Sequence, residues 1–264
     1  MKILDGKELA GYIKERQAHE VRRLVANGVQ PKLAILRDND GDVIRKYVGL
    51  KQKYGDDIGV VVEDFVVSTE ELIGKIDGLN RDNTVGGIIV QLPILEKERT
   101  EEVVSTIAAE KDADNLSGKA TVEPATAVAI NWLLTGYGVE LKGKKIAIVG
   151  RGRLVGAPLY RIWESMGCDV SVFHRGDDLT KLIEYDIIVS ATGVAGLIKT
   201  EMVKTGAVVV DAGTASEGGV IRGDVAPEVL LRKDLAAITP EKGGVGPLTV
   251  CLLFENLLRN YRGD

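Results

Sequence analysis

Three glycines follow a short apolar run at a spacing that could hold a dinucleotide. Residues 146–149 (Ile-Ala-Ile-Val) are typical of a buried strand, and the chain then continues through Gly150, Gly152 and Gly156. Glycines permit a tight turn and the close approach of a pyrophosphate, while the N-terminus of a following helix supplies free N–H groups. Gly156 comes one residue later than in the usual fingerprint, so an ordinary strand-to-helix turn is the alternative.

Basic side chains beside this turn indicate which dinucleotide would bind. Arg151 lies within the turn, and the next apolar run, 170–173, is followed by His174 and Arg175. An NAD site usually places an acid at the end of this second strand to bind the ribose 2′-hydroxyl, whereas guanidinium groups pair with a 2′-phosphate. We therefore expect NADP. Two aspartates follow shortly after, and the alternative is that Arg175 is a solvated loop residue.

Tyr47 and Lys51 form a second pair with chemical potential. Residues four apart lie on the same face of a helix. The ring could stack on an aromatic substrate while the amine transfers a proton. Because a lysine must lose its charge to act as a base, we expect burial to lower its pKa. Such pairs are also common on exposed helices, so a solvated pair is the alternative.

The composition excludes several classes of protein. The chain has 264 residues, and its 39 acidic and 34 basic side chains give a formal net charge of −5, which argues against nucleic-acid binding. No apolar run reaches the roughly 20 residues of a membrane helix, and Asp5 comes too early for a signal peptide. Cys168 and Cys251 are expected to be reduced core thiols, and no zinc-like spacing occurs. We therefore expect a cytoplasmic protein without a metal site or a membrane partner.

The apolar pattern predicts two successive α/β units that position these residues. Helices are expected over 7–26, 43–57 and 125–134, and another is expected from the capping box at 68–71. Buried strands are expected at 33–36, from 60, at 87–92, 146–149, 170–173, 187–189 and 208–210. Strands that alternate with helices form parallel sheets, so the fold class is α/β with two open α/β domains. The small, polar stretch 118–124 predicts the junction between them.

Several segments, in order along nearly the whole chain, resemble one family. They are Tyr47-Val48-Gly49-Leu50-Lys51-Gln52-Lys53; Val90-Gln91-Leu92-Pro93; Lys111-Asp112-Ala113-Asp114; Val149-Gly150-Arg151; Val155-Gly156-Ala157-Pro158; Gly223-Asp224-Val225; Thr239-Pro240; and Gly243-Gly244-Val245-Gly246-Pro247-Leu248-Thr249. Together they resemble the bifunctional methylenetetrahydrofolate dehydrogenase/methenyltetrahydrofolate cyclohydrolase family.

The resemblance implies an architecture and a reaction. Residues 1–119, completed by the C-terminal helix 248–264, would form the catalytic, folate-binding domain. Residues 120–247 would form a Rossmann NADP-binding domain, with folate in the cleft between the two. The protein would oxidise 5,10-methylenetetrahydrofolate and hydrolyse the methenyl product to 10-formyltetrahydrofolate. Its partners would be tetrahydrofolate substrates and a second copy in a homodimer.

The resemblance also implies a role for each matching residue. Lys51 would transfer the proton in the cyclohydrolase step, Gln91 would hydrogen-bond its amine, Tyr47 would stack on the aminobenzoyl ring, and Asp114 would hold the pterin. The expected cofactor-binding residues are Gly150, Arg151, Gly152, Val155, Gly156, His174, Arg175, Thr192 and Gly193. The expected substrate-binding residues are Tyr47, Lys51, Gln91, Leu92, Pro93, Asp114, Gly243, Gly244, Pro247 and Thr249.

This chain departs from the family pattern at several loops. Ile44 stands where a serine is usual, Asn115 replaces a glycine after Asp114, the loop 116–123 is shortened, and Arg175 replaces a serine. These changes leave three alternatives open. One is a dehydrogenase with weak or lost cyclohydrolase activity. The others are a non-catalytic folate- or nucleotide-binding protein and a dehydrogenase for another small substrate.

Overall fold

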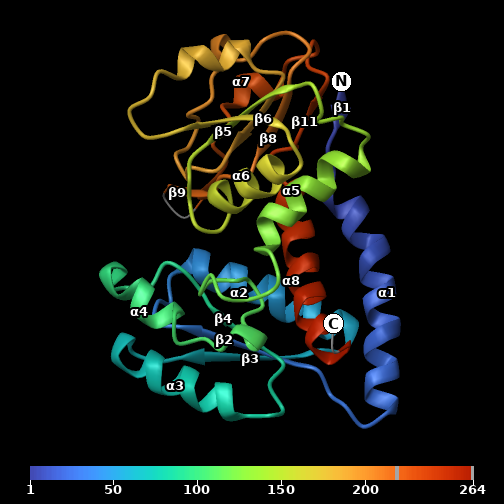
Figure 1. Cartoon of the computed structure of the whole chain (residues 1–264), viewed down its shortest axis with the longest axis vertical. Coiled ribbons are helices and arrows are strands. Elements are labelled where there is room, and N and C mark those ends of the chain that lie inside the picture. The colour runs from blue at the N-terminus through green and yellow to red at the C-terminus, as the bar shows by residue number, and fades with distance from the viewer. Residues whose placement is uncertain (218–219, 263–264) are drawn as a thin grey trace. The chain divides into compact units, whose positions relative to one another are not determined.

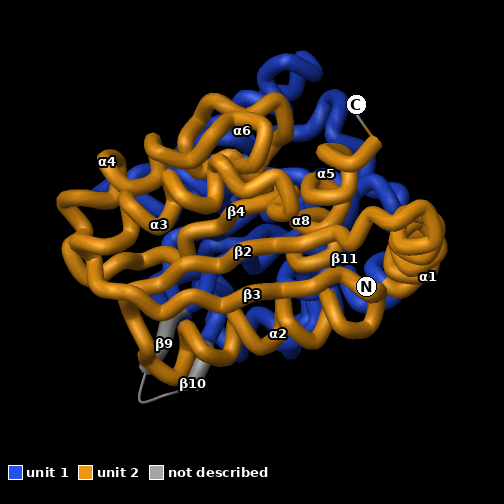
Figure 2. Tube along the Cα trace, turned by 90° about the horizontal axis from the view of Figure 1, so that it is seen from below, with its two compact units in different colours: residues 1–10, 126–249 blue, residues 11–125, 250–264 orange. Residues whose placement is uncertain are grey.

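The chain folds into two compact units, shown in different colours in Figure 2. The computed structural model describes residues 1–217 and 220–262, without the side chains of 215–217 and 220–221. Unit 1 comprises Met1–Ala10 and Thr126–Thr249, and unit 2 comprises Gly11–Ala125 and Val250–Asp264.

These limits differ from the expected 119/120 and 247/248, chiefly at the N-terminus. Strand β1 (Lys2–Ile3) pairs in parallel with β11 (Ala237–Ile238), so the first ten residues lie with unit 1 rather than with unit 2. Residues 263–264 of the expected C-terminal helix lie outside the described residues.

Unit 2 is built on a three-stranded parallel sheet of order β3-β2-β4. Its strands are β2 (Lys32–Arg37), β3 (Val61–Val66) and β4 (Gly87–Val90). Helices α2 (Asp42–Ile58) and α3 (Thr69–Arg81) lie on opposite faces of the sheet (Figure 1). The central strand is therefore covered on both sides, and residues 33–36 are fully buried. Beyond β4, Asp112 forms an isolated parallel bridge to Ile88.

Unit 2 also contains parts of two long helices and three short helical elements. Helix α1 (Gly6–Ala26) contributes its residues from Gly11, and α8 (Val245–Arg262) contributes its residues from Val250. Three short elements follow β4: η1 (Lys97–Arg99), α4 (Thr100–Val104) and η2 (Ala109–Lys111).

A buried polar network joins three helices of unit 2. Gln17 of α1 is fully buried, and its amide donates to the Cys251 carbonyl and to Glu255 Oε2, both at 3.0 Å. The Tyr54 hydroxyl of α2 donates to Gln17 Oε1 at 2.7 Å. These bonds satisfy groups that would destabilise an apolar core if left unpaired, and they fix α8 against α1 and α2.

Unit 1 is built on a six-stranded sheet of order β1-β11-β8-β7-β5-β6, in which every pair is parallel. Its remaining strands are β5 (Lys145–Val149), β6 (Asp169–Phe173), β7 (Ile187–Ser190) and β8 (Val208–Asp211). From β5 the chain passes to β6 on one side and then returns to β7 on the other. The order of the sheet therefore reverses between β5 and β7, where doubly wound sheets bind ligands.

The strands of unit 1 are joined mainly by short helices. They are α5 (Ala125–Gly136), α6 (Gly156–Ser165), η3 (Leu179–Glu184), η4 (Thr200–Met202) and α7 (Pro227–Leu230). Strands β9 (Ala215–Glu217) and β10 (Val220–Arg222) form an antiparallel pair.

The expected α/β class is confirmed. Among the described residues, no helix combines the length and apolar character needed to cross a membrane.

The loop after Asp114 turns through a left-handed residue, and this gives a test of the local fold. Asn115 has a φ of 48°, and its side-chain oxygen accepts from the Ala120 N–H at 3.1 Å. Glycine reaches this region freely, asparagine tolerates it, and β-branched residues do not. We expect Asn115→Val to reduce the free energy of unfolding by about 1–2 kcal/mol.

Asn115→Gly is the matched control for that substitution. It keeps the backbone conformation and loses only the hydrogen bond to Ala120, so its urea-unfolding midpoint should fall less than that of the valine variant. Equal midpoints for the two variants would show that the left-handed turn does not constrain this loop.

Candidate functional site

Helix α2 and the end of strand β4 bring Lys51 and Gln91 into contact. The Lys51 Nζ donates to Gln91 Oε1 at 2.6 Å. The Gln91 Nε2 donates to the Leu92 carbonyl at 3.2 Å, which turns the amide oxygen toward the amine. A neutral amine that donates one hydrogen to Gln91 keeps its lone pair, so it can still accept a proton.

Asp114 adds a carboxylate to this pair. Its Oδ1 accepts from the backbone N–H of Ala125, the first residue of α5, at 2.8 Å. The carboxylate also interacts electrostatically with Lys51, which itself contacts Gln91. A carboxylate at a helix N-terminus is favoured by the free N–H groups there.

Burial perturbs the pKa values of both ionisable groups. Removal from water lowers the pKa of Lys51 to about 8, although the Asp114 charge acts in the opposite direction. Burial raises the pKa of Asp114 to about 6, against the Ala125 N–H and the Lys51 charge, which lower it. One pH unit below its pKa, roughly a tenth of an amine is neutral, so near neutral pH Lys51 has an accessible basic form. Perturbed pairs of this kind are typical of catalytic sites.

The other expected residues of unit 2 lie around this group. Tyr47 lies four residues before Lys51 on α2 and is partly buried. Leu92 and Pro93 follow Gln91 directly and are joined by a cis peptide bond. Ile44, at the position where the family pattern has serine, is a buried core residue.

In the Lys111–Asp114 motif, Lys111 and Asp112 bind backbone groups and stabilise the local fold. Lys111 Nζ donates to the carbonyls of Leu79, Asn80 and Asp82 and so caps the end of α3. Asp112 is buried and accepts from the N–H groups of Leu116 and Ser117. Asp114 is therefore the acid of this motif that remains to interact electrostatically with Lys51.

In unit 1, the glycine turn lies at the reversal point of the sheet. Gly150 has a φ of +98° and donates its N–H to the Phe173 carbonyl of β6 at 2.9 Å. A Cβ at Gly150 would lie 2.7 Å from the Ala191 carbonyl oxygen, just after β7. Only glycine fits between these two strand ends. Val155 is the residue before α6, and Gly156 opens that helix.

Basic residues follow the two neighbouring strand ends. Arg151 and Gly152 follow β5 and are exposed, and His174 and Arg175 follow β6 and are also exposed. The structure thus places the expected arginines at adjacent positions on one edge of the sheet. This edge offers positive charge beside the N-terminus of α6, as a dinucleotide phosphate requires.

Asp224 fixes the loop that carries Thr192 and Gly193, and the sequence assigned it no role. It is fully buried, and its Oδ2 accepts from the Thr192 N–H at 2.6 Å, the Thr192 hydroxyl at 2.9 Å and the Ser190 hydroxyl at 2.7 Å. The backbone N–H of Asp224 in turn donates to Asp211 Oδ1 at 3.0 Å. Burial raises the pKa of Asp211. The Gly223-Asp224-Val225 motif is the sequence signal from which this role of Asp224 could have been predicted, because a buried acid between turn residues must bind backbone groups.

The last expected segment belongs to unit 1. The Gly243 carbonyl accepts from the Gly6 N–H at 2.9 Å, and α8 begins two residues later. Pro247 lies in the first turn of α8, and the Thr249 hydroxyl donates to the Val245 carbonyl at 3.2 Å. Gly244 is buried between these elements and packs near Thr239.

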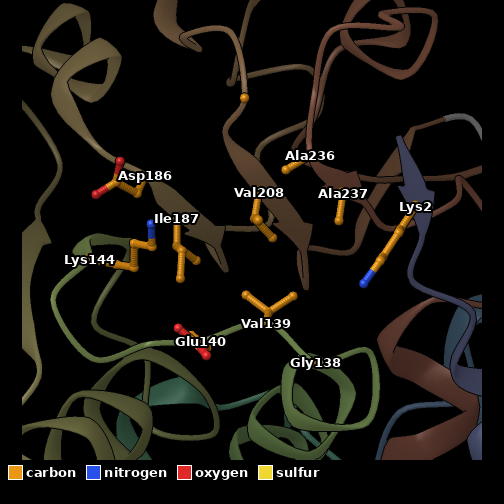
Figure 3. Close-up of a pocket in the computed structure, with 11 residues that line it drawn as sticks. Lys2, Gly138, Val139, Glu140, Lys144, Asp186, Ile187, Val208, Ala236 and Ala237 are labelled. Carbon is orange, nitrogen blue, oxygen red and sulfur yellow. The ribbon is translucent and has the colours of Figure 1, made fainter.

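A hollow in unit 1 lies away from the glycine turn. Lys2, Ile187, Val208 and Ala237 line it from the amino ends of β1, β7, β8 and β11 (Figure 3). The glycine turn stands at the carboxyl end of β5, so the hollow is separate from the residues expected to bind the dinucleotide. Within residues 1–217 and 220–262, no group of three or more side chains is arranged to hold a metal ion.

Comparison with known families accounts for nearly the whole chain. Residues 4–114 match the family "Tetrahydrofolate dehydrogenase/cyclohydrolase, catalytic domain", and residues 124–264 match "Tetrahydrofolate dehydrogenase/cyclohydrolase, NAD(P)-binding domain". The "Bifunctional protein FolD" of Lactobacillus delbrueckii subsp. bulgaricus is 39% identical over 98% of this chain and 97% of its own length. That of Methanosarcina barkeri is 39% identical over 97% and 95%, respectively.

Solved structures with the same fold carry related descriptions. The bifunctional FolD methylenetetrahydrofolate dehydrogenase/cyclohydrolase from Campylobacter jejuni has a TM-score of 0.91 and 32% identity, covering 100% of this chain and 99% of its own. The Trypanosoma brucei methylenetetrahydrofolate dehydrogenase-cyclohydrolase, complexed with NADP cofactor and an inhibitor, has a TM-score of 0.88 and 30% identity, covering 99% and 97%.

The Lys51–Asp114 pair makes a testable prediction about titration. Competitive acetylation with acetic anhydride, followed by peptide mass spectrometry, should give Lys51 an apparent pKa of about 8, well below the ordinary lysine value of 10.5. Because the Asp114 charge raises the Lys51 pKa, Asp114→Asn should lower it further. A Lys51 that titrates like a surface lysine in both proteins would contradict the buried-amine description.

Proposed function

This chain belongs to the tetrahydrofolate dehydrogenase/cyclohydrolase family, and from that membership we propose how its own residues carry the two reactions. It oxidises 5,10-methylenetetrahydrofolate to 5,10-methenyltetrahydrofolate with NADP, and it hydrolyses the methenyl compound to 10-formyltetrahydrofolate. These are two steps of one-carbon metabolism. The observation that carries the assignment of residues is the 2.6 Å hydrogen bond from Lys51 to Gln91, beside the Asp114 carboxylate.

Lys51 is the proposed base of the cyclohydrolase step. The methenyl substrate is a cation, so its charge adds to burial in favouring the neutral form of the amine. The neutral amine accepts a proton from water as the new oxygen–carbon bond forms. The protonated amine then gives this proton to the ring nitrogen as its bond to that carbon breaks, the hydroxyl proton is released to solvent, and Lys51 returns to its neutral form. Gln91 accepts a hydrogen bond from the amine throughout, which keeps the lone pair directed at the water.

Asp114 and Tyr47 are the proposed anchors for the folate. A carboxylate can accept two parallel hydrogen bonds from the polar edge of a pterin. Its pKa of about 6 leaves Asp114 charged at neutral pH. The Tyr47 ring, one turn before Lys51, would stack on the aminobenzoyl ring. Leu92, Pro93, Gly243, Gly244, Pro247 and Thr249 complete the proposed substrate-binding set.

The residues at the reversal point of the second sheet fit NADP. When bound, the cofactor accepts the hydride that leaves methylenetetrahydrofolate. Gly150, Gly152, Val155 and Gly156 admit a pyrophosphate at the N-terminus of α6. Arg151 and Arg175 would pair with the 2′-phosphate, next to His174. Asp224 holds Thr192 and Gly193 at the neighbouring strand end.

A homodimer and a cytoplasmic location are also proposed for this chain. The likeness to the family supports the homodimer, and the two free cysteines support the location.

Replacing Lys51 tests the proposed base. Lys51→Met keeps the length of the side chain and removes the amine, so we expect cyclohydrolase activity to fall by at least about a hundredfold, as when a general base is lost. The measurement is the loss of methenyltetrahydrofolate absorbance above the spontaneous rate. Lys53→Met, at an exposed position two residues later, is the control and should keep full activity. Undiminished hydrolysis by Lys51→Met would exclude Lys51 as the base.

Arg175 tests the choice of cofactor. Arg175→Ser removes a charged contact with the 2′-phosphate, so the KM for NADP should rise about tenfold to a hundredfold while the KM for NAD changes little. Lys181→Ser removes one positive charge further along the chain and controls for general electrostatics. If Arg175→Ser changed both KM values equally, the assignment of Arg175 to the 2′-phosphate would be wrong.

A further inference from the structure

Asn256 of helix α8 binds two backbone carbonyls that are far apart in sequence. It is 8% exposed, and its Nδ2 donates to the Ala113 carbonyl at 3.0 Å and to the Glu123 carbonyl at 3.1 Å. Both hydrogens of the side-chain amide are therefore used. All three residues belong to unit 2.

The two carbonyls mark the ends of the loop that carries Asp114. Ala113 precedes Asp114, and Glu123 precedes the Pro124–Ala125 step. The Ala125 N–H is the group that binds Asp114 Oδ1 at 2.8 Å. The separation of Ala113 and Glu123 therefore sets where the carboxylate meets its N–H partner, and Asn256 fixes that separation.

The amide suits this task better than other side chains. Two backbone carbonyls, of which that of Ala113 is buried, need two donors from one short, neutral group, and asparagine supplies both. An aspartate would place negative charge against two acceptors, while a serine could satisfy only one of them. The apolar residues around it on α8, including Leu252, Leu253 and Leu257, are buried.

We propose that Asn256 is a positioning residue for reduced-folate binding, which acts through Asp114 by holding the two ends of the 114–123 loop together. This inference rests on the proposed role of Asp114 toward the pterin. Asn256 is not itself expected to touch the substrate or the cofactor.

Asn256→Ser and Asn260→Ser form a matched pair of variants. Asn260 lies one turn later on α8, and its Nδ2 also donates to a backbone carbonyl, that of Gly86, at 2.8 Å. In the dehydrogenase assay, Asn256→Ser should raise the KM for methylenetetrahydrofolate about tenfold and leave the KM for NADP unchanged. Asn260→Ser should change neither. Equal effects of the two variants, or a matching rise in the KM for NADP, would overturn the proposal.

A double-mutant cycle separates the role of Asp114 in folate binding from the action of Asn256 through Asp114. If Asn256 acts through Asp114, then Asn256→Ser should add little to the KM for folate in an Asp114→Asn background. Full additivity would overturn the inference while leaving the role of Asp114 intact. An unchanged KM for folate in Asp114→Asn alone would instead contradict the proposed role of Asp114.

Lys51 provides a readout that general destabilisation would not move. Displacement of the Asp114 charge should lower the apparent pKa of Lys51 in Asn256→Ser and not in Asn260→Ser, measured by the same competitive acetylation. If the serine variant does not fold, Asn256→Gln replaces it, because it keeps both donors and shifts them by one methylene. An unshifted Lys51 in a folded variant would refute the proposed action through Asp114.

Discussion

Removal of one lysine amine from bulk water is the constraint on which the site of unit 2 depends. Desolvation lowers the pKa of Lys51 and so favours the neutral amine, whereas the negative charge of a nearby carboxylate raises the pKa and favours the protonated amine. Gln91 contributes a neutral acceptor, so it fixes the amine in place without adding charge. The basicity of Lys51 is therefore set by how deeply the amine is buried and by how near Asp114 stands. Both quantities are properties of the backbone that carries the three side chains.

That backbone is held by strands buried on both faces and by polar groups in the core. Gln91 directly follows β4, and Asp112 lies along the outer edge of the same strand through its bridge to Ile88. Gln17 and Tyr54 fix α8 against the rest of unit 2, and α8 in turn carries Asn256 to the 114–123 loop. Positions of catalytic groups that must hold to a fraction of an ångström thus rest on buried hydrogen bonds, which are directional, more than on apolar contacts, which are not.

The sequence predicted most of the two sheets and part of each site. Continuous apolar runs such as 33–36 and 146–149 are strong signals, and the capping box at Ser68 and Glu71 forms as expected. Strands β1 and β11 were missed because two residues carry no periodicity, and this is why the limits of the units differ from those expected. The contact of Lys51 with Gln91 was expected only through the family resemblance, since spacing along a helix does not reveal what a distant strand end brings to it. Asn256 left no local signal, because an asparagine within an apolar helix shows its partners only after the chain has folded.

The pairing of early with late segments of the chain also bears on how the protein folds during its synthesis. The strand partner of β1 is β11, more than two hundred residues later, and unit 2 lacks its last helix until residues 250–262 have been added. During synthesis from the N-terminus, the hydrogen-bond network of Gln17 and Tyr54 therefore cannot be completed until Cys251 and Glu255 have been synthesised. Likewise, Lys2 cannot pair in the sheet until Ala237 has been synthesised. The sheet of unit 1 is therefore complete only after β11 has been synthesised, and the core of unit 2 only after residues 250–262 have been synthesised. A nascent chain that stalls before α8 thus exposes the unfinished core of unit 2 to chaperones and proteases.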